Sequence, residues 1–166
     1  MKITGSALRY GDDINTDLIY PGRYLHIYEP EEMAKHAMAD LDPEFPEKFK
    51  KGDIIVAGKN FGCGSSREQA AICLKYLGVG AIVASSFARI FFRNAINQGI
   101  PILEAETDGI SWGDKLEIYP EKGIIKNLTT GKTIHGTVVP SFLMELIEDG
   151  GLIPHLKKSL SKNGKN

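Results

Sequence analysis

The residues best suited to chemistry stand together in the segment GKNFGCGSSRE, residues 58–68. Two glycines, Gly62 and Gly64, allow a sharp turn and a close approach of the backbone to a ligand. A helix predicted to begin at Arg67 would point free backbone N–H groups and a partial positive charge at carboxylates or phosphates. Arg67 itself adds a planar cation that binds a carboxylate through two hydrogen bonds. The segment therefore predicts a site for a small dianionic or dicarboxylate ligand.

The same segment has a purely structural interpretation. Ser65 and Glu68 fit the S-x-x-E capping box, in which the two side chains satisfy backbone N–H groups at the start of a helix. A serine in that role stabilises the fold by about 1 kcal/mol and needs no catalysis to explain it. The spacing of Ser65 and Glu68, taken alone, favours a helix cap over a functional role for the serine. The patterns of a P-loop and of a G-x-S-x-G nucleophile elbow are both absent from the sequence.

Cys63 lies in the same turn and offers a different chemistry. A helix start and a nearby arginine favour the reactive form of a thiol, so a redox or nucleophilic cysteine is an alternative hypothesis. The simpler interpretation is a small residue packed in a turn. Cys73 is expected on the core face of the next helix, and both thiols are expected to be reduced.

Metal chemistry needs more ligands than this sequence offers. Two cysteines and four scattered histidines do not supply the roughly four ligands of a structural zinc site or an iron–sulfur cluster. We therefore expect no metal and no cofactor on this chain. If the protein works with a cluster, another chain must supply it.

Alternating strands and helices are predicted to position the turn. Buried strands are expected at 54–57, 81–84 and 101–104, with helices at 67–77 and 87–98 between them. Such a β-α-β-α-β run predicts a small parallel sheet with helices packed against it. Outside this run, a strand at 2–9 is expected on a sheet edge, and a helix is expected at 30–39.

The pattern changes after Gly109 to alternating apolar and polar residues, which predicts antiparallel strands at 115–119, 123–126 and 132–138. A short helix is expected at 141–149. Residues 157–166 hold four lysines and no acidic residue, and they are predicted to be a frayed, disordered basic tail. The prediction is one α/β domain, residues 1–156.

Composition excludes several classes of protein. The chain has 166 residues, of which 42% are hydrophobic and 25% charged, enough for one globular domain. A net charge of -1 argues against a nucleic-acid partner. No apolar stretch approaches the ~20 residues that cross a bilayer. The first residues also lack the apolar core of a secretory signal. We expect a cytoplasmic protein with no membrane partner.

Three segments resemble the aconitase superfamily. Residues 59–71 (KNFGCGSSREQAA) are similar to its serine-bearing signature, residues 86–99 to the segment that follows, and residues 11–25 to the opening loop of its separate small subunits. The resemblance is to the small subunits of the isopropylmalate dehydratase and homoaconitase families. It implies a swivelling β/β/α domain that is a separate chain here. It also implies a large-subunit partner that carries a [4Fe–4S] cluster.

The resemblance further implies a reaction and a role for several residues. The reaction is a dehydration followed by a rehydration that interconverts 2-isopropylmalate and 3-isopropylmalate through isopropylmaleate, in leucine biosynthesis. The serine base of the superfamily falls on Ser65. Contacts to the substrate carboxylates fall on Gly64, Ser66 and Arg67, and a further contact falls on Arg23. An alkoxide at Ser65 would be stabilised by the free N–H groups of the helix start. The helix cap and the general base are therefore alternative roles for the same side-chain oxygen of Ser65.

Substrate choice is implied to depend on the residues after Arg23, namely Tyr24, Leu25, His26 and Ile27. Homoaconitase-type chains tend to carry arginine then threonine after the Tyr-Leu pair, and isopropylmalate-type chains carry apolar residues. His26–Ile27 matches neither pattern in full, because Ile27 suits an isopropyl group and a protonated His26 suits a further carboxylate.

Isopropylmalate is therefore the expected main substrate. A homoaconitase-type or dual activity on a tricarboxylate is the alternative. A non-enzymatic domain that binds a di-acid as a regulator is a third hypothesis. The isolated chain is also a candidate for self-association.

Overall fold

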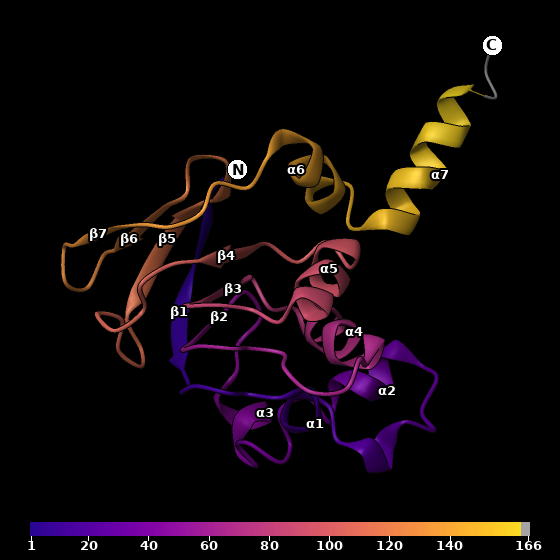
Figure 1. Cartoon of the computed structure of the whole chain (residues 1–166), viewed down its shortest axis with the longest axis horizontal. Helices are drawn as coiled ribbons and strands as arrows, with labels where there is room; N and C mark the ends of the chain where they lie inside the picture. The colour runs from indigo at the N-terminus through magenta and orange to yellow at the C-terminus, as the bar shows by residue number, and fades with distance from the viewer. Residues whose placement is uncertain (164–166) are drawn as a thin grey trace.

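The computed structural model describes residues 1–163, which form a mixed seven-stranded sheet with helices against its parallel half (Figure 1). The strand order is β4-β3-β2-β1-β5-β6-β7. The strands are β1 (Ile3–Arg9), β2 (Ile54–Ala57), β3 (Ala81–Ala84), β4 (Ile102–Glu104), β5 (Lys115–Tyr119), β6 (Ile124–Asn127) and β7 (Thr133–His135). The predicted combination of a parallel sheet with antiparallel strands is confirmed.

The helices follow most of the predicted ranges. They are α1 (Thr16–Ile19), η1 (Gly22–Tyr24), α2 (Pro30–Ala34), α3 (Phe45–Lys48), α4 (Glu68–Leu77), α5 (Arg89–Asn97), η2 (Pro120–Lys122), α6 (Ser141–Glu148) and α7 (Leu152–Asn163). The segments α1, η1 and α3 lie inside residues 10–24 and 40–53, two stretches whose glycines, prolines and aspartates are typical of loops. The helix predicted over 30–39 is shorter, since α2 ends at Ala34 and continues as turns.

Strand β1 is the centre of the sheet, so its prediction as an edge strand was wrong. Its residues 7–9 pair in parallel with β2, and its residues 3–6 pair antiparallel with β5. One seven-residue strand thus joins the two halves of the sheet by using different residues for each neighbour. Its alternation of polar and apolar residues resembles that of an edge strand, and the sequence gives no sign of pairing on both sides.

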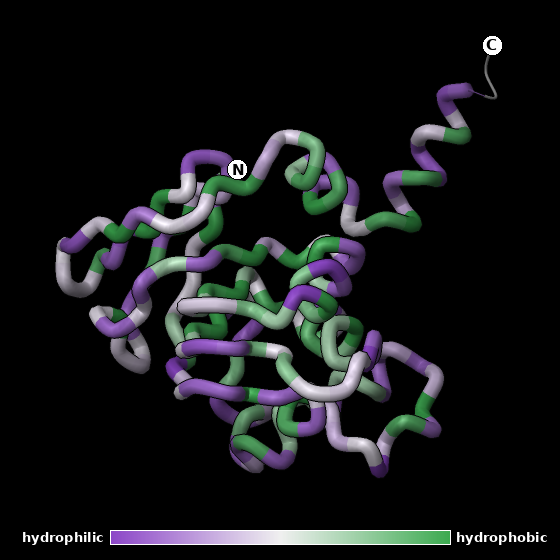
Figure 2. The backbone as a smooth tube through the Cα atoms, viewed as in Figure 1, coloured by the Kyte–Doolittle hydropathy of each residue, from purple (hydrophilic) through white to green (hydrophobic). Residues whose placement is uncertain are grey.

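The core lies between the parallel strands and the helices. Every residue of β2 and β3 is buried, as expected for parallel strands covered on both faces. Helices α4 and α5 supply the opposing apolar surface, with Leu74 and Phe91 among the buried side chains. Figure 2 shows hydrophobic segments gathered at the centre of the molecule, where these strands and helices meet.

The predicted frayed tail is helical over residues 157–163, which belong to α7. Residues 164–166 of that predicted tail lie outside the described residues. Gly150 and Gly151, with φ of 88° and 127°, end α6 and redirect the chain. The leucines and lysines that follow are good helix formers, and Pro154 is tolerated in the first turn. The domain limit at 156 stays a prediction.

Candidate active site

The glycine-rich turn between β2 and α4 is tied to the loop that precedes α1. The Gly62 N–H donates to the Ile14 carbonyl at 2.8 Å, and the Thr16 N–H donates to the Cys63 carbonyl at 2.8 Å. The Thr16 hydroxyl donates to the Ser65 carbonyl at 2.7 Å. Two of the segments singled out in the sequence are therefore held together by hydrogen bonds to backbone carbonyl groups.

Glycine is required at the base of this turn. Gly62 has a φ of 82° and Gly64 a φ of 94°, a region that side chains rarely adopt. At Gly62 a Cβ would also overlap the side chain of Phe91 on α5. The close packing of the turn against α5 fixes its position relative to the second helix.

The serine cap predicted from spacing is wrong. Helix α4 begins at Glu68 with Arg67 as its N-cap residue, and no side chain caps it. The extended backbone of Arg67, with φ of -137° and ψ of 110°, delays the helix beyond the reach of a Ser65 cap. Ser65 and Ser66 are both exposed, and within residues 1–163 their hydroxyl groups make no hydrogen bond. The fold therefore leaves both hydroxyl groups free.

Arg67 is oriented by contacts from the opposite loop. Its Nη1 donates to Asp17 Oδ1 at 2.6 Å and to the Tyr20 carbonyl at 3.0 Å. Asp17 Oδ1 also accepts the Gly22 N–H at 2.9 Å. The hydrogen bond from Arg67 holds the pKa of the Asp17 carboxyl below its usual value. This pair keeps the guanidinium of Arg67 in one place beside the serines.

Asp17 is a site residue that the sequence reasoning missed. Fifty residues separate it from Arg67, so no local pattern indicates their contact. The complementary charges are visible in the sequence, but their pairing depends on the fold.

The serines and Arg67 line one cavity of about 190 Å³ between the turn and α5. Its lining includes Thr16, Gly62, Gly64, Ser65, Ser66 and Arg67 from one side, and Ala88, Arg89, Ile90, Phe91 and Asn94 from the other. Arg89, at the start of α5, adds a second cation to the cavity. Two arginines, free hydroxyl groups and the N-terminus of α4 suit an anionic ligand.

Arg23 and the predicted specificity residues do not line this cavity. Arg23 binds Asp40 through two hydrogen bonds of 2.8 and 2.7 Å, which lower the pKa of the Asp40 carboxyl. The Tyr24 ring stacks on His36 with ring centroids 3.8 Å apart. Leu25 and His26 are exposed, and Ile27 packs partly against the core. Of the predicted site residues, the cavity lining thus contains Gly64, Ser65, Ser66 and Arg67. Residues 23–27 lie outside this lining.

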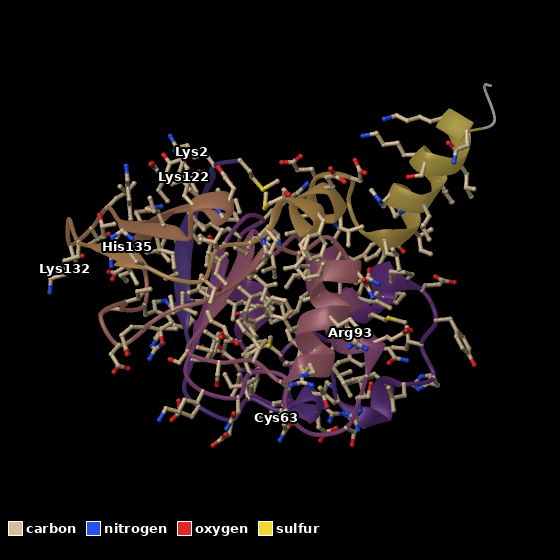
Figure 3. All side chains as sticks on the ribbon, turned by 45° about the horizontal axis from the view of Figure 1, so that its top comes forward. Lys2, Cys63, Arg93, Lys122, Lys132 and His135 are labelled. Carbon is tan, nitrogen blue, oxygen red and sulfur yellow. The ribbon has the colours of Figure 1, made fainter. Side chains whose placement is uncertain are left out.

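The two cysteines have different surroundings. Cys63 is half-buried in the turn, on the helical half of the molecule (Figure 3). Cys73 is buried in α4, and burial raises the pKa of its thiol. The pair does not fit an iron–sulfur cluster, because two thiols on separate elements are half of the ligands it needs. Among residues 1–163 no three His, Cys, Asp or Glu side chains are grouped to hold a metal ion.

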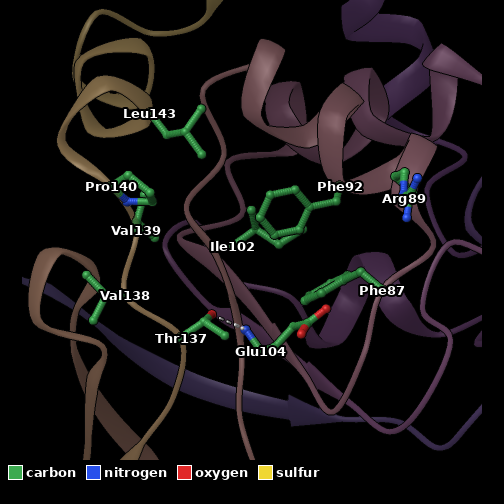
Figure 4. Close-up of a pocket in the computed structure, with 10 residues that line it drawn as sticks. All are labelled: Phe87, Arg89, Phe92, Ile102, Glu104, Thr137, Val138, Val139, Pro140 and Leu143. Atoms are coloured by element: carbon green, nitrogen blue, oxygen red, sulfur yellow. Dashed lines mark hydrogen bonds between the residues drawn. The ribbon is translucent and has the colours of Figure 1, made fainter.

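A second cavity of about 320 Å³ lies beyond Arg89 and is lined mainly by apolar residues such as Phe87, Phe92 and Val139 (Figure 4). Its charged side chains are Arg89 and Glu104. A carboxylate in the lining disfavours an anionic ligand, so this cavity is a poorer candidate than the one beside the serines. No helix of the described chain is both long and apolar enough to cross a membrane.

Residues 10–108 match the family model of the aconitase C-terminal domain. The 3-isopropylmalate dehydratase small subunit of Nautilia profundicola is 55% identical over 162 residues, covering 97% of this chain and 98% of that protein. The isopropylmalate/citramalate isomerase small subunit of Methanocaldococcus jannaschii is 50% identical over 163 residues and 97% of each chain. The crystal structure of 3-isopropylmalate dehydratase from Methanocaldococcus jannaschii matches with a TM-score of 0.94 and 49% identity over 100% of both chains.

These similarities confirm the predicted fold, the swivelling β/β/α domain of the aconitase superfamily. They extend over nearly the full length of the chain and of its relatives. This chain therefore belongs to the 3-isopropylmalate dehydratase small-subunit family, a family of hydro-lyases within the aconitase superfamily.

Proposed function

We propose that this chain is the small subunit of a heteromeric, cytoplasmic hydro-lyase of leucine biosynthesis. The enzyme interconverts 2-isopropylmalate and 3-isopropylmalate through isopropylmaleate. The observation that carries the proposal is the pair of free serine hydroxyl groups beside Arg67 and Arg89 in one cavity at the start of α4. The names of the relatives supply the substrate class.

Ser65 is the general base in this proposal. Its alkoxide removes the proton from the carbon next to the hydroxyl-bearing carbon, and the hydroxyl group leaves as water to give isopropylmaleate. In the second half the Ser65 hydroxyl delivers a proton to the carbon that first carried the hydroxyl group, while water adds to the other carbon. The cations that line the same cavity, Arg67 and Arg89, favour the negative charge on the oxygen. Within residues 1–163 no hydrogen bond engages the Ser65 hydroxyl, which supports this role, since a base must be free to take the proton.

The substrate carboxylates bind the neighbouring residues. Arg67, fixed by Asp17, offers a guanidinium to one carboxylate, and Ser66 and the Gly64 backbone add hydrogen bonds. Arg23 contributes a further contact if substrate displaces Asp40. Tyr24, Leu25, His26 and Ile27 then face the variable group of the substrate once the partner closes over the cavity.

The partner is the large subunit, which carries the [4Fe–4S] cluster. When bound there, the cluster supplies a Lewis acid for the departing hydroxyl group. The exposure of Ser65 and the small volume of the cavity support a site completed by another chain, because a reacting substrate is normally enclosed.

Other substrates remain candidates on specific observations. The exposed His26 favours some activity on cis-homoaconitate, whose extra carboxylate a protonated imidazole would bind. The relative from Methanocaldococcus jannaschii is named for citramalate as well. A non-enzymatic di-acid-binding domain is the remaining alternative. It predicts that the isolated chain binds a di-acid with the same affinity whether or not a partner is present.

The experiment compares Ser65→Ala with Ser66→Ala in the enzyme reconstituted anaerobically with the cognate large subunit. Ser65→Ala is expected to lower kcat by about 10²- to 10⁴-fold, the usual contribution of a general base. Ser66→Ala is expected mainly to raise KM. Thermal unfolding should match the wild type in both variants, because neither hydroxyl supports the fold. A kcat unchanged by Ser65→Ala would remove the serine base from the proposal.

A further inference from the structure

The glycine-rich turn between β2 and α4, residues 58–67 and here called the serine turn, contains a residue with an unusual backbone. Within residues 1–163 three non-glycine residues have a positive φ, namely Asp13, Met38 and Asn60. Asp13 has a φ of 56° and Asn60 a φ of 60°. Asparagine and aspartate tolerate this left-handed region, but glycine adopts it more easily. Such strain is concentrated at functional sites, so its presence here calls for a reason.

The side chains of Asp13 and Asn60 bind each other. Asn60 Nδ2 donates to Asp13 Oδ1 at 2.9 Å, across 47 residues of sequence. The hydrogen bond joins the loop before α1 to the first part of the serine turn. Glycine at either position would relieve the strain but would remove this bond. The polar side chains at both positions therefore indicate that the bond itself has a role.

Backbone hydrogen bonds join the same two segments next to the pair. The Asp13 N–H donates to the Lys59 carbonyl at 2.8 Å, and the Gly58 N–H donates to the Gly11 carbonyl at 3.0 Å. The Lys59 N–H donates to Asp12 Oδ1 at 2.7 Å. The approach is so close that a Cβ at Gly58 would overlap the Asp12 side chain. The two segments are therefore held together before the turn reaches its serines.

Asn60 also connects this contact to the rest of the turn. Its backbone N–H donates to Ser86 Oγ at 2.8 Å, in the segment before α5. Its carbonyl accepts the Cys63 N–H at 3.2 Å. Among the hydrogen bonds of Asn60 within residues 1–163, the bond to Asp13 is the one that uses its side chain. A change in that bond can therefore reach Cys63 and the serines through the backbone.

We propose that Asp13 and Asn60 are positioning residues, whose hydrogen bond holds the serine turn so that Ser65 lies where it acts as the base. The inference rests on the proposed function of Ser65. Neither residue of the pair lines the serine cavity, so the pair acts through the backbone of the turn and not on the substrate.

The arginine of the turn has anchors of its own. Asp17 and the Tyr20 carbonyl hold the Arg67 guanidinium. A small shift of the serines should therefore leave the carboxylate contact at Arg67 largely in place. A misplaced base slows the reaction while substrate still binds, so kcat should change more than KM.

The kinetic test uses Asn60→Gly and Asp13→Gly in the enzyme reconstituted with the cognate large subunit. Glycine keeps the positive φ and removes the side-chain hydrogen bond, so both variants should fold. The kcat for 2-isopropylmalate is expected to fall about tenfold, with a change in KM of less than about threefold. Asp13→Asn keeps the acceptor oxygen and is expected to retain the wild-type kcat.

Cys63 supplies a readout that does not depend on activity. It is half-buried in the serine turn, whereas Cys73 is buried. Alkylation of the full chain with iodoacetamide, followed by mass spectrometry of the Cys63 peptide, measures how firmly the turn is held. The rate is expected to rise about threefold in both glycine variants, because the turn opens more often. Asp13→Asn should react at the wild-type rate.

A second asparagine–aspartate pair, on the antiparallel half, is the matched control. Asn127 Nδ2 donates to Asp114 Oδ2 at 2.8 Å. Figure 3 shows Cys63 well separated from Lys132 and His135, which mark that half. Asn127→Ala should lower the unfolding temperature, because the pair is buried. The kcat and the Cys63 alkylation rate of the folded chain should match the wild type.

Four results would overturn the inference. They are an unchanged alkylation rate in both glycine variants, faster alkylation with an unchanged kcat, an Asp13→Asn variant as impaired as Asp13→Gly, and an Asn127→Ala variant that behaves like the glycine variants. A wild-type mixture that fails to convert 2-isopropylmalate would instead contradict the proposed function. The alkylation rates would then still decide whether the pair holds the turn.

Discussion

The serine turn and the segment Gly22–Ile27 were both predicted to contact the substrate, and the fold holds them in different ways. Each presents an arginine bound to an aspartate, Arg67 to Asp17 and Arg23 to Asp40. The Arg67 side chain is only 18% exposed, whereas that of Arg23 is 56% exposed. The turn is fixed by hydrogen bonds to a distant loop, and the segment mainly by its own near neighbours.

This difference separates two tasks. The turn is fixed through its backbone while its hydroxyl groups stay free, which suits chemistry that needs accurate geometry. The segment keeps Leu25 and His26 at the surface, which suits contact with a partner or with the variable part of a substrate. Changes in the turn should therefore affect stability and rate, and changes in the segment should affect selectivity.

The largest expected effect in this comparison is on stability. Gly62→Ala should lower the free energy of unfolding by about 3 kcal/mol, because the methyl group overlaps Phe91 and the backbone has a positive φ. Gly22→Ala should cost less than about 1 kcal/mol, since the nearest atom, Arg67 Nη2, lies 3.3 Å from the added Cβ and has to shift only slightly. Urea unfolding of both variants measures the two values. Equal losses would mean that the turn is no more constrained than the segment.

The next effect concerns the two arginine–aspartate pairs. Asp17→Asn should raise KM by about tenfold in the reconstituted enzyme, because Arg67 loses the anion that orients it. Asp40→Asn should change KM by no more than about twofold, since Arg23 is already exposed. Steady-state kinetics compares the pair. A larger rise for Asp40→Asn would transfer the main carboxylate contact from Arg67 to Arg23.

The same two variants test acid stability. The arginines hold the pKa of Asp17 and of Asp40 below the ordinary carboxyl value. Each pair therefore contributes stability above the unfolded pKa, near 4, and loses that contribution as pH falls through the lower, folded pKa. Either Asn variant should lose less stability than wild type over that acid range. Unfolding curves at several pH values check this, and an unchanged slope would contradict it.

A smaller effect is expected at His26. His26→Ala should change the ratio of kcat/KM for 2-isopropylmalate over cis-homoaconitate by about threefold, because an exposed imidazole binds a carboxylate weakly. The kcat for 2-isopropylmalate should stay the same. Competition between the two substrates measures the ratio directly. Identical ratios for the variant and wild type would remove His26 from substrate selection.

The smallest effect is expected at Cys63. Cys63→Ser should keep near wild-type kcat, because the half-buried side chain is not among the residues that line the serine cavity. Loss of turnover in this variant, with full turnover in Ser65→Ala, would replace the serine base with a cysteine.

Local sequence patterns predicted the elements that carry the turn. Strands β2 and β3 have the residue limits expected from their apolar runs, because both are short and fully buried. The turn itself is marked by glycines whose positive φ only glycine adopts easily. These features depend on neighbours in the sequence, and so a single sequence reveals them.

Contacts between distant segments were not predictable in the same way. The capping-box spacing of Ser65 and Glu68 is real, but the extended Arg67 moves the start of α4 beyond it. The extension accompanies the pairing of Arg67 with Asp17, fifty residues away. The central place of β1 and the exposed α7 likewise depend on which surfaces meet, which local periodicity does not encode.

Anaerobic turnover of 2-isopropylmalate tests the central claim most directly. This chain and the cognate cluster-bearing large subunit are assayed together and each alone, by the absorbance of the unsaturated intermediate. Turnover is expected only in the mixture. Turnover by either chain alone, or a mixture with intact cluster that converts neither 2-isopropylmalate nor cis-homoaconitate, would contradict it.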